Sequence, residues 1–172
     1  ELRQSDLILT NVRGIYSDVI SDHVFSFVLS FARATHHFAR RQHQASWVND
    51  NVPMIFLGNT TIGIIGLGGI GLAVAQRAHA FGMRILALDP SPKGTPDYVE
   101  HIYTPTDLHQ LLAQSDFVTI CVPQTDETVH MIDGAAIGAM KQGAILINIG
   151  RGKVVDLQAL TVAVETGKLA GA

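Results

Sequence analysis

The sequence predicts an α/β fold in which one parallel sheet is covered by helices on both faces, giving three layers. Short apolar runs alternate with helical patterns from residue 60 to the end of the chain. The runs are rich in β-branched residues and nearly free of charge, which is typical of strands buried on both faces. Strands that alternate with helices connect in parallel. With 172 residues, and at about 150 residues per domain, the chain is one domain with room for a fragment of a second.

Each element of the sheet and its helices is expected at a defined place. We expect strands at 61–66, 84–88, 99–103, 116–122, 143–149 and 169–172, and helices at 70–81, 107–114, 133–140 and 156–166. Gly82 and Gly167 follow two of these helices, as glycine commonly does where a helix ends. Asp133 can cap the start of another. The Pro and Gly residues of 90–96 predict a loop where a helix would normally follow the second strand.

The first 60 residues follow a different pattern. Residues 7–10 are expected to form a strand, and a long helix is expected from Ser17 or Ser21, either of which can cap it, to about Gln42. Its apolar residues cover more than one narrow stripe: Val19, Ile20, Val24, Phe25, Phe27, Val28, Phe31, Ala32, Phe38 and Ala39. The pattern predicts burial on two sides. These sides are covered either by the sheet and a second subunit, or by two layers of the same domain, and the sequence favours neither.

Composition excludes several kinds of partner. The net charge is −3, 47% of the residues are hydrophobic and 16% are charged, which is typical of a folded globular chain. No block rich in Lys and Arg is present, so we expect neither nucleic acid nor a membrane surface as the main partner. The longest nearly uncharged stretch, 60–76, is shorter than the roughly 20 apolar residues that a membrane span requires.

The start of the chain and its single cysteine indicate the compartment. Residues 1–6 lack the basic-then-apolar pattern of a secretory signal. Cys121, as the only cysteine, excludes an internal disulfide and a metal site built from several cysteines. The adjacent His36 and His37 would point about 100° apart on a helix, and the other histidines have no motif context, so we expect no metal. The sequence therefore predicts a reduced, soluble, cytoplasmic protein.

A glycine-rich turn joins the first expected strand to its helix. Residues 66–71 read Gly-Leu-Gly-Gly-Ile-Gly and fit the pattern G-x-G-x-x-G between a strand and a helix. Gly66 permits the tight turn, Gly68 lets the backbone approach a pyrophosphate, and Gly71 lets helix and strand pack closely. Free N–H groups at the start of the helix would face the phosphates. The turn predicts a Rossmann-type, doubly wound α/β domain that binds a dinucleotide.

Asp89 ends the second expected strand, 18 residues after Gly71. A carboxylate at this place can accept hydrogen bonds from the adenosine ribose hydroxyls and would repel a 2′-phosphate. We therefore expect NAD rather than NADP as the cofactor. The alternative interpretation is that Asp89 is an aspartate of the turn at the strand end, before Pro90, and does not contact a cofactor.

Segments along nearly the whole chain resemble, in the same order, those of the D-isomer-specific 2-hydroxyacid dehydrogenases. Asn11, Gly14 and the long helix after them take part in this resemblance. The remaining segments are 63–71 (GIIGLGGIG), 81–84 (FGMR), 89–90 (DP), 115–116 (SD), 122–128 (VPQTDET), 140–144 (MKQGA), 148–156 (NIGRGKVVD) and 167–172 (GKLAGA). The resemblance implies an oxidoreductase that reversibly transfers a hydride between NAD(H) and a small 2-oxo or 2-hydroxy acid. Glyoxylate, hydroxypyruvate and 3-phosphoglycerate are all candidates.

The resemblance also implies roles for individual residues. Arg151 corresponds to the catalytic arginine, and a guanidinium at the end of a central strand can grip a carboxylate while polarising the adjacent carbonyl. The implied cofactor contacts are Gly69 and Ile70 at the pyrophosphate, Val122 and Pro123 along the adenosine, and Ile149 and Gly150 near the nicotinamide. Many relatives carry a basic or polar side chain where Gly69 stands, so one possible phosphate contact is absent here.

By the same resemblance, residues 1–16 are a linker and a remnant of the junction with a substrate domain. Residues 17–172 are then a dinucleotide-binding domain that is incomplete at its C-terminus. The family's catalytic histidine and its glutamate follow the segment at which this chain ends, so we expect these 172 residues alone to be inactive. The family also includes NAD(H)-responsive corepressors that dimerise through this domain, which is the alternative function. We expect a homodimer through the helix near residues 17–42.

Overall fold

The computed structural model contains one six-stranded sheet in which all strands are parallel. It describes residues 6–8, 10, 12, 14–47, 51–92 and 94–172. The strand order is β3-β2-β1-β4-β5-β6, and every neighbouring pair is parallel. The strands are β1 (Thr61–Ile65), β2 (Arg84–Leu88), β3 (His101–Tyr103), β4 (Phe117–Ile120), β5 (Ala144–Asn148) and β6 (Leu169–Gly171).

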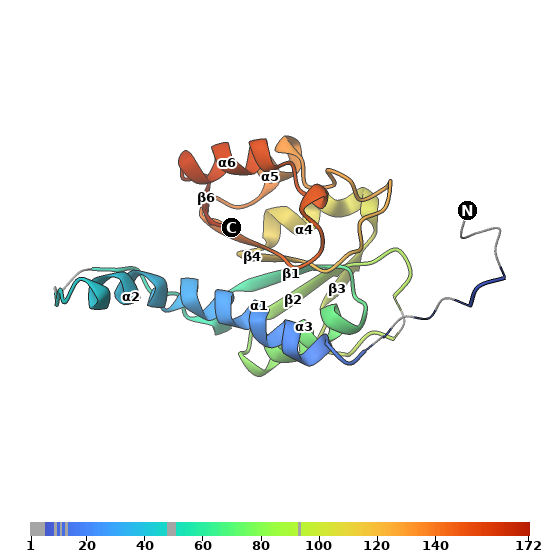
Figure 1. The fold of residues 1–172 in the computed structure, drawn as a ribbon, viewed down its shortest axis with the longest axis horizontal. Coiled ribbons are helices and arrows are strands. Elements are labelled where there is room, and N and C mark those ends of the chain that lie inside the picture. Colours follow the sequence, from blue (N-terminus) through green and yellow to red (C-terminus); the bar gives the residue numbers. More distant parts are fainter. Residues whose placement is uncertain (1–5, 9, 11, 13, 48–50, 93) are drawn as a thin grey trace.

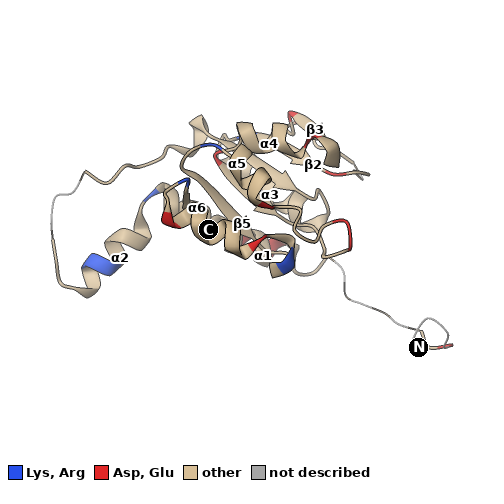
Figure 2. Cartoon of the chain, turned by 90° about the horizontal axis from the view of Figure 1, so that it is seen from above, with Lys and Arg blue, Asp and Glu red and all other residues tan. Residues whose placement is uncertain are grey.

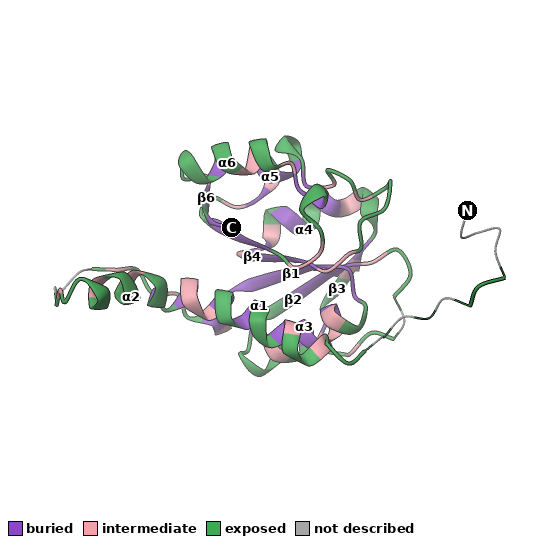
Figure 3. Cartoon of the chain, in the orientation of Figure 1, coloured by how far each residue is buried: buried purple, intermediate pink, exposed green. Residues whose placement is uncertain are grey.

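Helices cover both faces of this sheet (Figure 1). One face carries α1 (Ser17–Ala32) and α3 (Gly69–Ala80), and the other carries α4 (Leu108–Gln114), α5 (Gly134–Ala139) and α6 (Leu157–Glu165). Alternate residues of the strands enter two apolar clusters, one under each helical layer. The strands are accordingly the buried centre of the molecule (Figure 3). The expected three-layer, doubly wound architecture is confirmed.

The direction of strand addition reverses between β1 and β4. From β1 the chain proceeds outward to β2 and β3, and it then crosses to β4 on the other side of β1. The loops that leave the carboxyl ends of β1 and β4 therefore diverge, which creates the crevice where open α/β sheets bind ligands. The register places Ile65 beside Leu88 and Ile120. Residues that follow these three consequently gather at one edge of the sheet.

The elements expected after residue 60 are all present, with bounds that move by at most two residues. Gly82 follows α3 with φ +70° and Gly167 follows α6 with φ +72°, the left-handed conformation in which glycine ends a helix. The Asp133 side chain caps α5 by accepting the N–H of Ala136 at 2.8 Å. The described part of the expected loop, 90–92 and 94–96, contains neither helix nor strand, as expected. Val99 and Glu100, which were expected to begin the third strand, lie outside β3.

The long helix expected up to Gln42 is instead two helices. α1 ends at Ala32, and α2 (Thr35–His43) begins after Ala34, whose φ of +53° lies in the left-handed region. Ile55, on the returning chain, donates its N–H to the carbonyl oxygen of Ala32 at 2.8 Å. A helix continues only while its carbonyls accept from its own next turn, so this contact accounts for the break.

The expected caps and strand near the N-terminus are wrong. Tyr16 is the N-cap residue of α1 without a side-chain cap, Ser17 is already helical, and Ser21 donates its hydroxyl to Asp18 O within the helix. Residues 7, 8 and 10 are not in a strand, while Leu9 and Asn11 lie outside the described residues. Leu7, Ile8 and Thr10 are exposed, so none of these three described residues is buried against the sheet.

α1 is buried on one side, and α2 on neither. Val24, Phe25, Val28 and Ala32 pack into the cluster between α1, α3 and the sheet, whereas Phe27 is 42% exposed. α2 has no buried residue and extends away from the sheet (Figure 1). Burial of both sides within one domain is therefore wrong, because the second apolar side meets solvent. A second subunit on that side stays a prediction.

The described surface carries charges of both signs on several elements (Figure 2). Arg84 pairs with Glu100 at 2.6 Å, and Lys141 pairs with Asp116 at 2.9 Å. Within the described ranges, no helix is both long enough and apolar enough to cross a membrane.

Candidate functional site

The glycine-rich turn lies at the carboxyl end of β1 and begins α3. Gly66 has φ +96°, a conformation that glycine adopts at no steric cost. A Cβ at Gly71 would collide with the carbonyl oxygen of Gly66, so only glycine lets α3 approach the strand this closely. A Cβ at Gly68 would meet nothing within 4 Å, and Gly68 is exposed. The turn is therefore tightly packed at both ends and accessible along its middle.

The first amides of α3 can bind an anion. The N–H of Leu72 is the first to bond within this helix, donating to Gly68 O at 2.9 Å. No described residue accepts from the N–H groups of Gly69, Ile70 and Gly71. Unpaired amides at a helix start, together with the helix dipole, are suited to phosphate. The turn thus fits the pyrophosphate of a dinucleotide.

Asp89 follows β2 and reaches the same turn. One of its carboxylate oxygens accepts the N–H of Leu67 at 2.8 Å, and the other accepts the N–H of Ser91 at 2.8 Å. The sequence predicted a carboxylate here but not its bond to the turn. An ionised carboxylate has about four lone-pair sites, so Asp89 can hold the turn and still accept from ribose hydroxyls.

The loops after β4 and β5 complete this edge of the sheet. A Cβ at Gly66 would lie 2.9 Å from Cγ1 of Val122, and a Cβ at Gly150 would lie 2.7 Å from the carbonyl oxygen of Val122. Ile149 donates its N–H to Ile120 O at 3.2 Å. Pro123, directly after Val122, is exposed. The structure therefore brings together the turn, Asp89 and both strand ends that the sequence singled out.

Arg151 is exposed on the loop after β5, and Asn148 holds that loop. Asn148 Oδ1 accepts the N–H of Gly150 at 2.9 Å, and its Nδ2 donates to the carbonyl oxygen of Arg151 at 3.1 Å. The guanidinium itself donates to Gly150 O at 3.3 Å. Sequence reasoning assigned no role to Asn148; the signal was an amide at the end of an otherwise apolar strand. Its two hydrogen bonds fix the backbone that carries Arg151.

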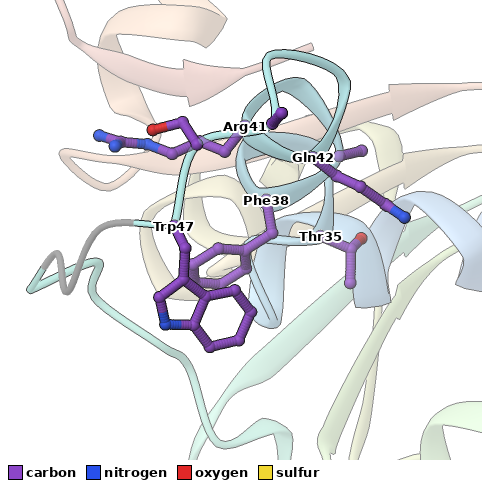
Figure 4. A pocket seen from close by; sticks show the side chains of 8 residues that line it. Thr35, Phe38, Arg41, Gln42 and Trp47 are labelled. Carbon is purple, nitrogen blue, oxygen red and sulfur yellow. The ribbon is translucent and has the colours of Figure 1, made fainter.

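A hollow of about 910 Å³ adjoins the same edge. It lies between α1 and the end of β5, lined by Val19, Ile20, Asp22, His23, Ser26, Phe27, Phe31, Ile147, Asn148, Ile149 and Ala172. A second hollow, of about 760 Å³, is formed by α2 and Trp47 (Figure 4). The first belongs to the candidate site because it shares Asn148 and Ile149 with the sheet edge. The second is formed by α2, which extends away from the sheet.

Cys121 does not have the properties of a nucleophile. It packs with the cluster under α1, and burial raises the pKa of its thiol to about 12. The thiol is therefore neutral near pH 7, whereas the thiolate is the reactive form. Among the residues that the structure describes, no group of three or more His, Cys, Asp or Glu could hold a metal ion.

Comparison with protein families matches residues 25–172 to the D-isomer specific 2-hydroxyacid dehydrogenase, NAD binding domain. A glyoxylate reductase of Korarchaeum cryptofilum is 39% identical over 179 residues, covering 100% of this chain and 53% of that protein. The glyoxylate/hydroxypyruvate reductase B of Serratia proteamaculans is 38% identical over 175 residues, covering 98% of this chain and 53% of that protein. The chain thus spans about half the length of the curated relatives it matches.

Solved structures of D-2-hydroxyacid dehydrogenases are also similar to this chain. A D-lactate dehydrogenase from Aquifex aeolicus, complexed with NAD and lactic acid, is similar with a TM-score of 0.82 and 36% identity, over 90% of this chain and 46% of that one. A D-isomer specific 2-hydroxyacid dehydrogenase from Xanthobacter autotrophicus Py2, in complex with NADPH and MES, has a TM-score of 0.84 and 28% identity, over 96% of this chain and 68% of that one.

Proposed function

The chain belongs to the D-isomer specific 2-hydroxyacid dehydrogenases, whose NAD-binding domain it forms, and from this premise we propose that the whole protein reversibly oxidises a small D-2-hydroxy acid. The observation that carries the proposal is an arginine, Arg151, on the same sheet edge as a dinucleotide turn. NAD, when bound, supplies or accepts the hydride. The chain's own residues hold the cofactor and orient the acid.

The proposed cofactor contacts follow the edge of the sheet. The amides of Gly69 and Ile70 bind the pyrophosphate, which their free N–H groups at the start of α3 support, and Gly68 lets the backbone approach it. Gly66 and Gly71 shape the turn. The adenosine lies along Val122 and Pro123, and the nicotinamide lies near Ile149 and Gly150, beside the hollow under α1.

We propose NAD(H) rather than NADP(H) as the preferred cofactor of this chain, because Asp89 presents a carboxylate at the end of β2. A 2′-phosphate would meet that charge. The similar enzyme from Xanthobacter was solved with NADPH, so the preference needs its own measurement.

Calorimetric titration of the chain with NADH and with NADPH tests this preference. NADH is expected to bind more tightly, and Asp89→Ala is expected to weaken NADH binding about tenfold, the cost of lost hydrogen bonds to a charged group. Asp97→Ala is the matched control, since Asp97 is an exposed acid on the same loop. Equal affinity of parent and Asp89→Ala for NADH would contradict the role of Asp89.

Arg151 is the proposed catalytic residue within these 172 residues. Its guanidinium stays charged and can bind the substrate carboxylate with two parallel hydrogen bonds. The same cation stabilises the negative charge that develops on the reacting oxygen. Asn148 positions it by holding the loop. The proton is exchanged with a histidine, held by a glutamate, in the half of the protein that this chain does not span.

The proposed substrate is a small 2-oxo acid or its 2-hydroxy counterpart. The similar proteins include glyoxylate reductases and a glyoxylate/hydroxypyruvate reductase, so glyoxylate and hydroxypyruvate are the first acids to assay. The assay requires the full-length protein and follows NADH absorbance. The 172-residue chain is expected to bind NADH without turnover. Turnover above background by this chain alone would contradict the proposal that catalysis also requires a histidine in the half of the protein that the chain does not span.

We further propose a homodimer through the region of residues 17–42, which forms α1 and α2, with the exposed apolar residues of α2 and of the chain after it at the contact. Phe38 is 39% exposed, Trp47 101% and Phe56 71%. Figure 4 shows Phe38 and Trp47 lining the hollow on α2. A second copy would bury these side chains, and exposed apolar patches commonly mark such contacts. Sedimentation is expected to give a dimer that Trp47→Ala weakens and that Leu157→Ala, an exposed apolar residue of α6, leaves intact.

A cytoplasmic location is proposed with this function. The support is the single cysteine, Cys121, which lies free and half-buried, because reduced thiols are typical of that compartment. Fractionation of the source cells with an antibody to the chain tests it, and recovery from a membrane or secreted fraction would contradict it.

A further inference from the structure

Ser17, outside the glycine-rich turn, lies directly against it. A Cβ built at Gly69 would lie 2.9 Å from the hydroxyl oxygen of Ser17, and beyond the neighbouring residues and backbone of α3 no other described atom comes within 4 Å of that position. The Ser17 hydroxyl therefore occupies the space beside Gly69 that a side chain at residue 69 would fill. It lies next to the free amides with which the proposed function binds the cofactor pyrophosphate.

α1 is fixed in this position by contacts with α3. Arg77 of α3 donates to the carboxylate of Asp22 at 2.7 Å and lies 3.5 Å from that of Asp18, both in the first half of α1. Further along, the rings of Phe25 and Phe81 stack with centroids 5.3 Å apart. The two helices thus run in the same direction, and both begin at the carboxyl edge of the sheet. Arg77 also offsets the charge of Asp18, the acid beside Ser17.

The Ser17 hydroxyl is a free donor at this place. Ser17 is half-buried, and its own N–H donates to Gly14 O at 3.4 Å. No hydrogen bond from its hydroxyl to another described residue is present, in contrast to Ser21 and Ser26, whose hydroxyls donate to carbonyls within α1. α1 has four serines, and Ser17 and Ser30 are the two whose hydroxyls donate to no described residue. Of these two, only Ser17 lies at the glycine-rich turn, where its hydroxyl can serve a ligand.

We infer that Ser17 donates a hydrogen bond from Oγ to the pyrophosphate of the bound dinucleotide, as a cofactor-binding residue additional to the glycine-rich turn. The inference rests on the proposed function. It explains why a glycine at 69 is compatible with phosphate binding: the hydroxyl arrives from α1 instead of from residue 69. A side chain at 69 and the Ser17 hydroxyl would compete for the same space.

Calorimetric titration of the chain with NADH, ADP-ribose and adenosine tests the inference. Ser17→Ala is expected to weaken NADH and ADP-ribose about tenfold, as for a hydrogen bond to a charged group. Adenosine, which has no pyrophosphate, is expected to bind parent and variant within about twofold of each other. Thr161→Ala, which removes an exposed hydroxyl of α6 away from the candidate site, is the control and is expected to change nothing.

A second variant reaches the same contact by another route. Gly69→Ala places a methyl group where the Ser17 hydroxyl lies, so it is expected to cost about the same tenfold. The double variant is expected to lose no more than either single one, because there is only one contact to lose. Thermal melts of all variants verify that they fold.

The outcomes separate the inference from the proposed function. Failure of the folded parent chain to bind NADH would overturn the proposed function, and the inference with it. Parent binding that Ser17→Ala leaves unchanged would overturn the inference alone. Equal weakening of adenosine, or losses that multiply in the double variant, would also overturn it, because Ser17 would then act through the fold and not through the pyrophosphate.

Discussion

Gly150 and Gly152 flank Arg151, and replacing each with alanine should have opposite effects on stability. A Cβ at Gly150 would lie 2.7 Å from Val122 O and 3.3 Å from Asn148 Oδ1, whereas a Cβ at Gly152 would meet nothing within 4 Å. A relaxed carbon contact is about 3.5 Å or longer, so Gly150→Ala must push the loops after β4 and β5 apart. The obstacle is a backbone carbonyl, which cannot rotate away.

The size of each effect can be estimated. Overpacking a well-packed site costs about 1–3 kcal/mol, and replacing glycine by alanine returns about 0.4–1 kcal/mol by restricting the unfolded chain. Because the contact is short and the backbone carbonyl is rigid, the upper part of that cost, about 2–3 kcal/mol, applies, and Gly150→Ala should lower the free energy of unfolding by about 1–2.6 kcal/mol. Gly152→Ala creates no close contact and only restricts the unfolded chain, so it should raise the free energy of unfolding by about 0.4–1 kcal/mol. At about 2–4 °C per kcal/mol for a chain of this size, the two melting temperatures should move in opposite directions.

Urea unfolding followed by circular dichroism measures both changes. Each variant is the control for the other, because both replace a glycine by alanine and the two positions lie on one loop. A Gly150→Ala variant as stable as the parent would refute the close contact between the β4 and β5 loops. A Gly152→Ala variant that loses stability would refute the open space assigned to residue 152.

Three other changes test separate features. Thr119 is buried and its hydroxyl has no hydrogen-bond partner among the described residues, so Thr119→Val should raise the free energy of unfolding in urea by about 1 kcal/mol; a loss would show that the hydroxyl is satisfied. In the folded chain, burial raises the pKa of the Cys121 thiol from an ordinary 9.0 to about 12. The unfolded chain therefore releases the thiol proton at a lower pH than the folded chain, and the free energy of unfolding should fall as pH rises above 9. Cys121→Ala should flatten that slope, and an unchanged slope would contradict the shift. In the full-length protein, Arg151→Lys should lower kcat/KM about a hundredfold, since a lysine cannot bind a carboxylate with two parallel hydrogen bonds, while the Kd for NADH stays within twofold; unchanged kcat/KM would remove Arg151 from the reaction.

The sequence was sufficient for the sheet and for the turn because their signals are local. Gly66, Gly71 and Gly82 occupy positions that the backbone itself dictates, either by positive φ or by contact with a neighbouring backbone atom. Apolar runs between such residues leave few alternatives to buried strands. Asp89 follows from the length of one strand–helix–strand unit.

The remaining features depend on contacts between segments far apart in the sequence. Ala34 has φ +53°, yet alanine carries no preference for that conformation, and the break before it coincides with the bond from Ile55 to Ala32. Ser17 looked like a helix cap because serine commonly is one; its contact with residue 69 appears only once α1 lies along α3. Asn148 is similar, since its two bonds depend on how the loop after β5 turns.

The first turns of α1 connect the two ends of the candidate site. Ser17 lies against Gly69, at the pyrophosphate end, while Val19 and Ile20 line the hollow that contains Ile149, at the proposed nicotinamide end. A helix rises about 1.5 Å per residue, so these three residues cover only about 5 Å of α1 and cannot move independently. Arg77, by holding Asp18 and Asp22 on the same turns, fixes both contacts at once. α1 is therefore a wall of the candidate site and not only a cover for the sheet, and a change that releases it from α3 should loosen the pyrophosphate and the nicotinamide ends together.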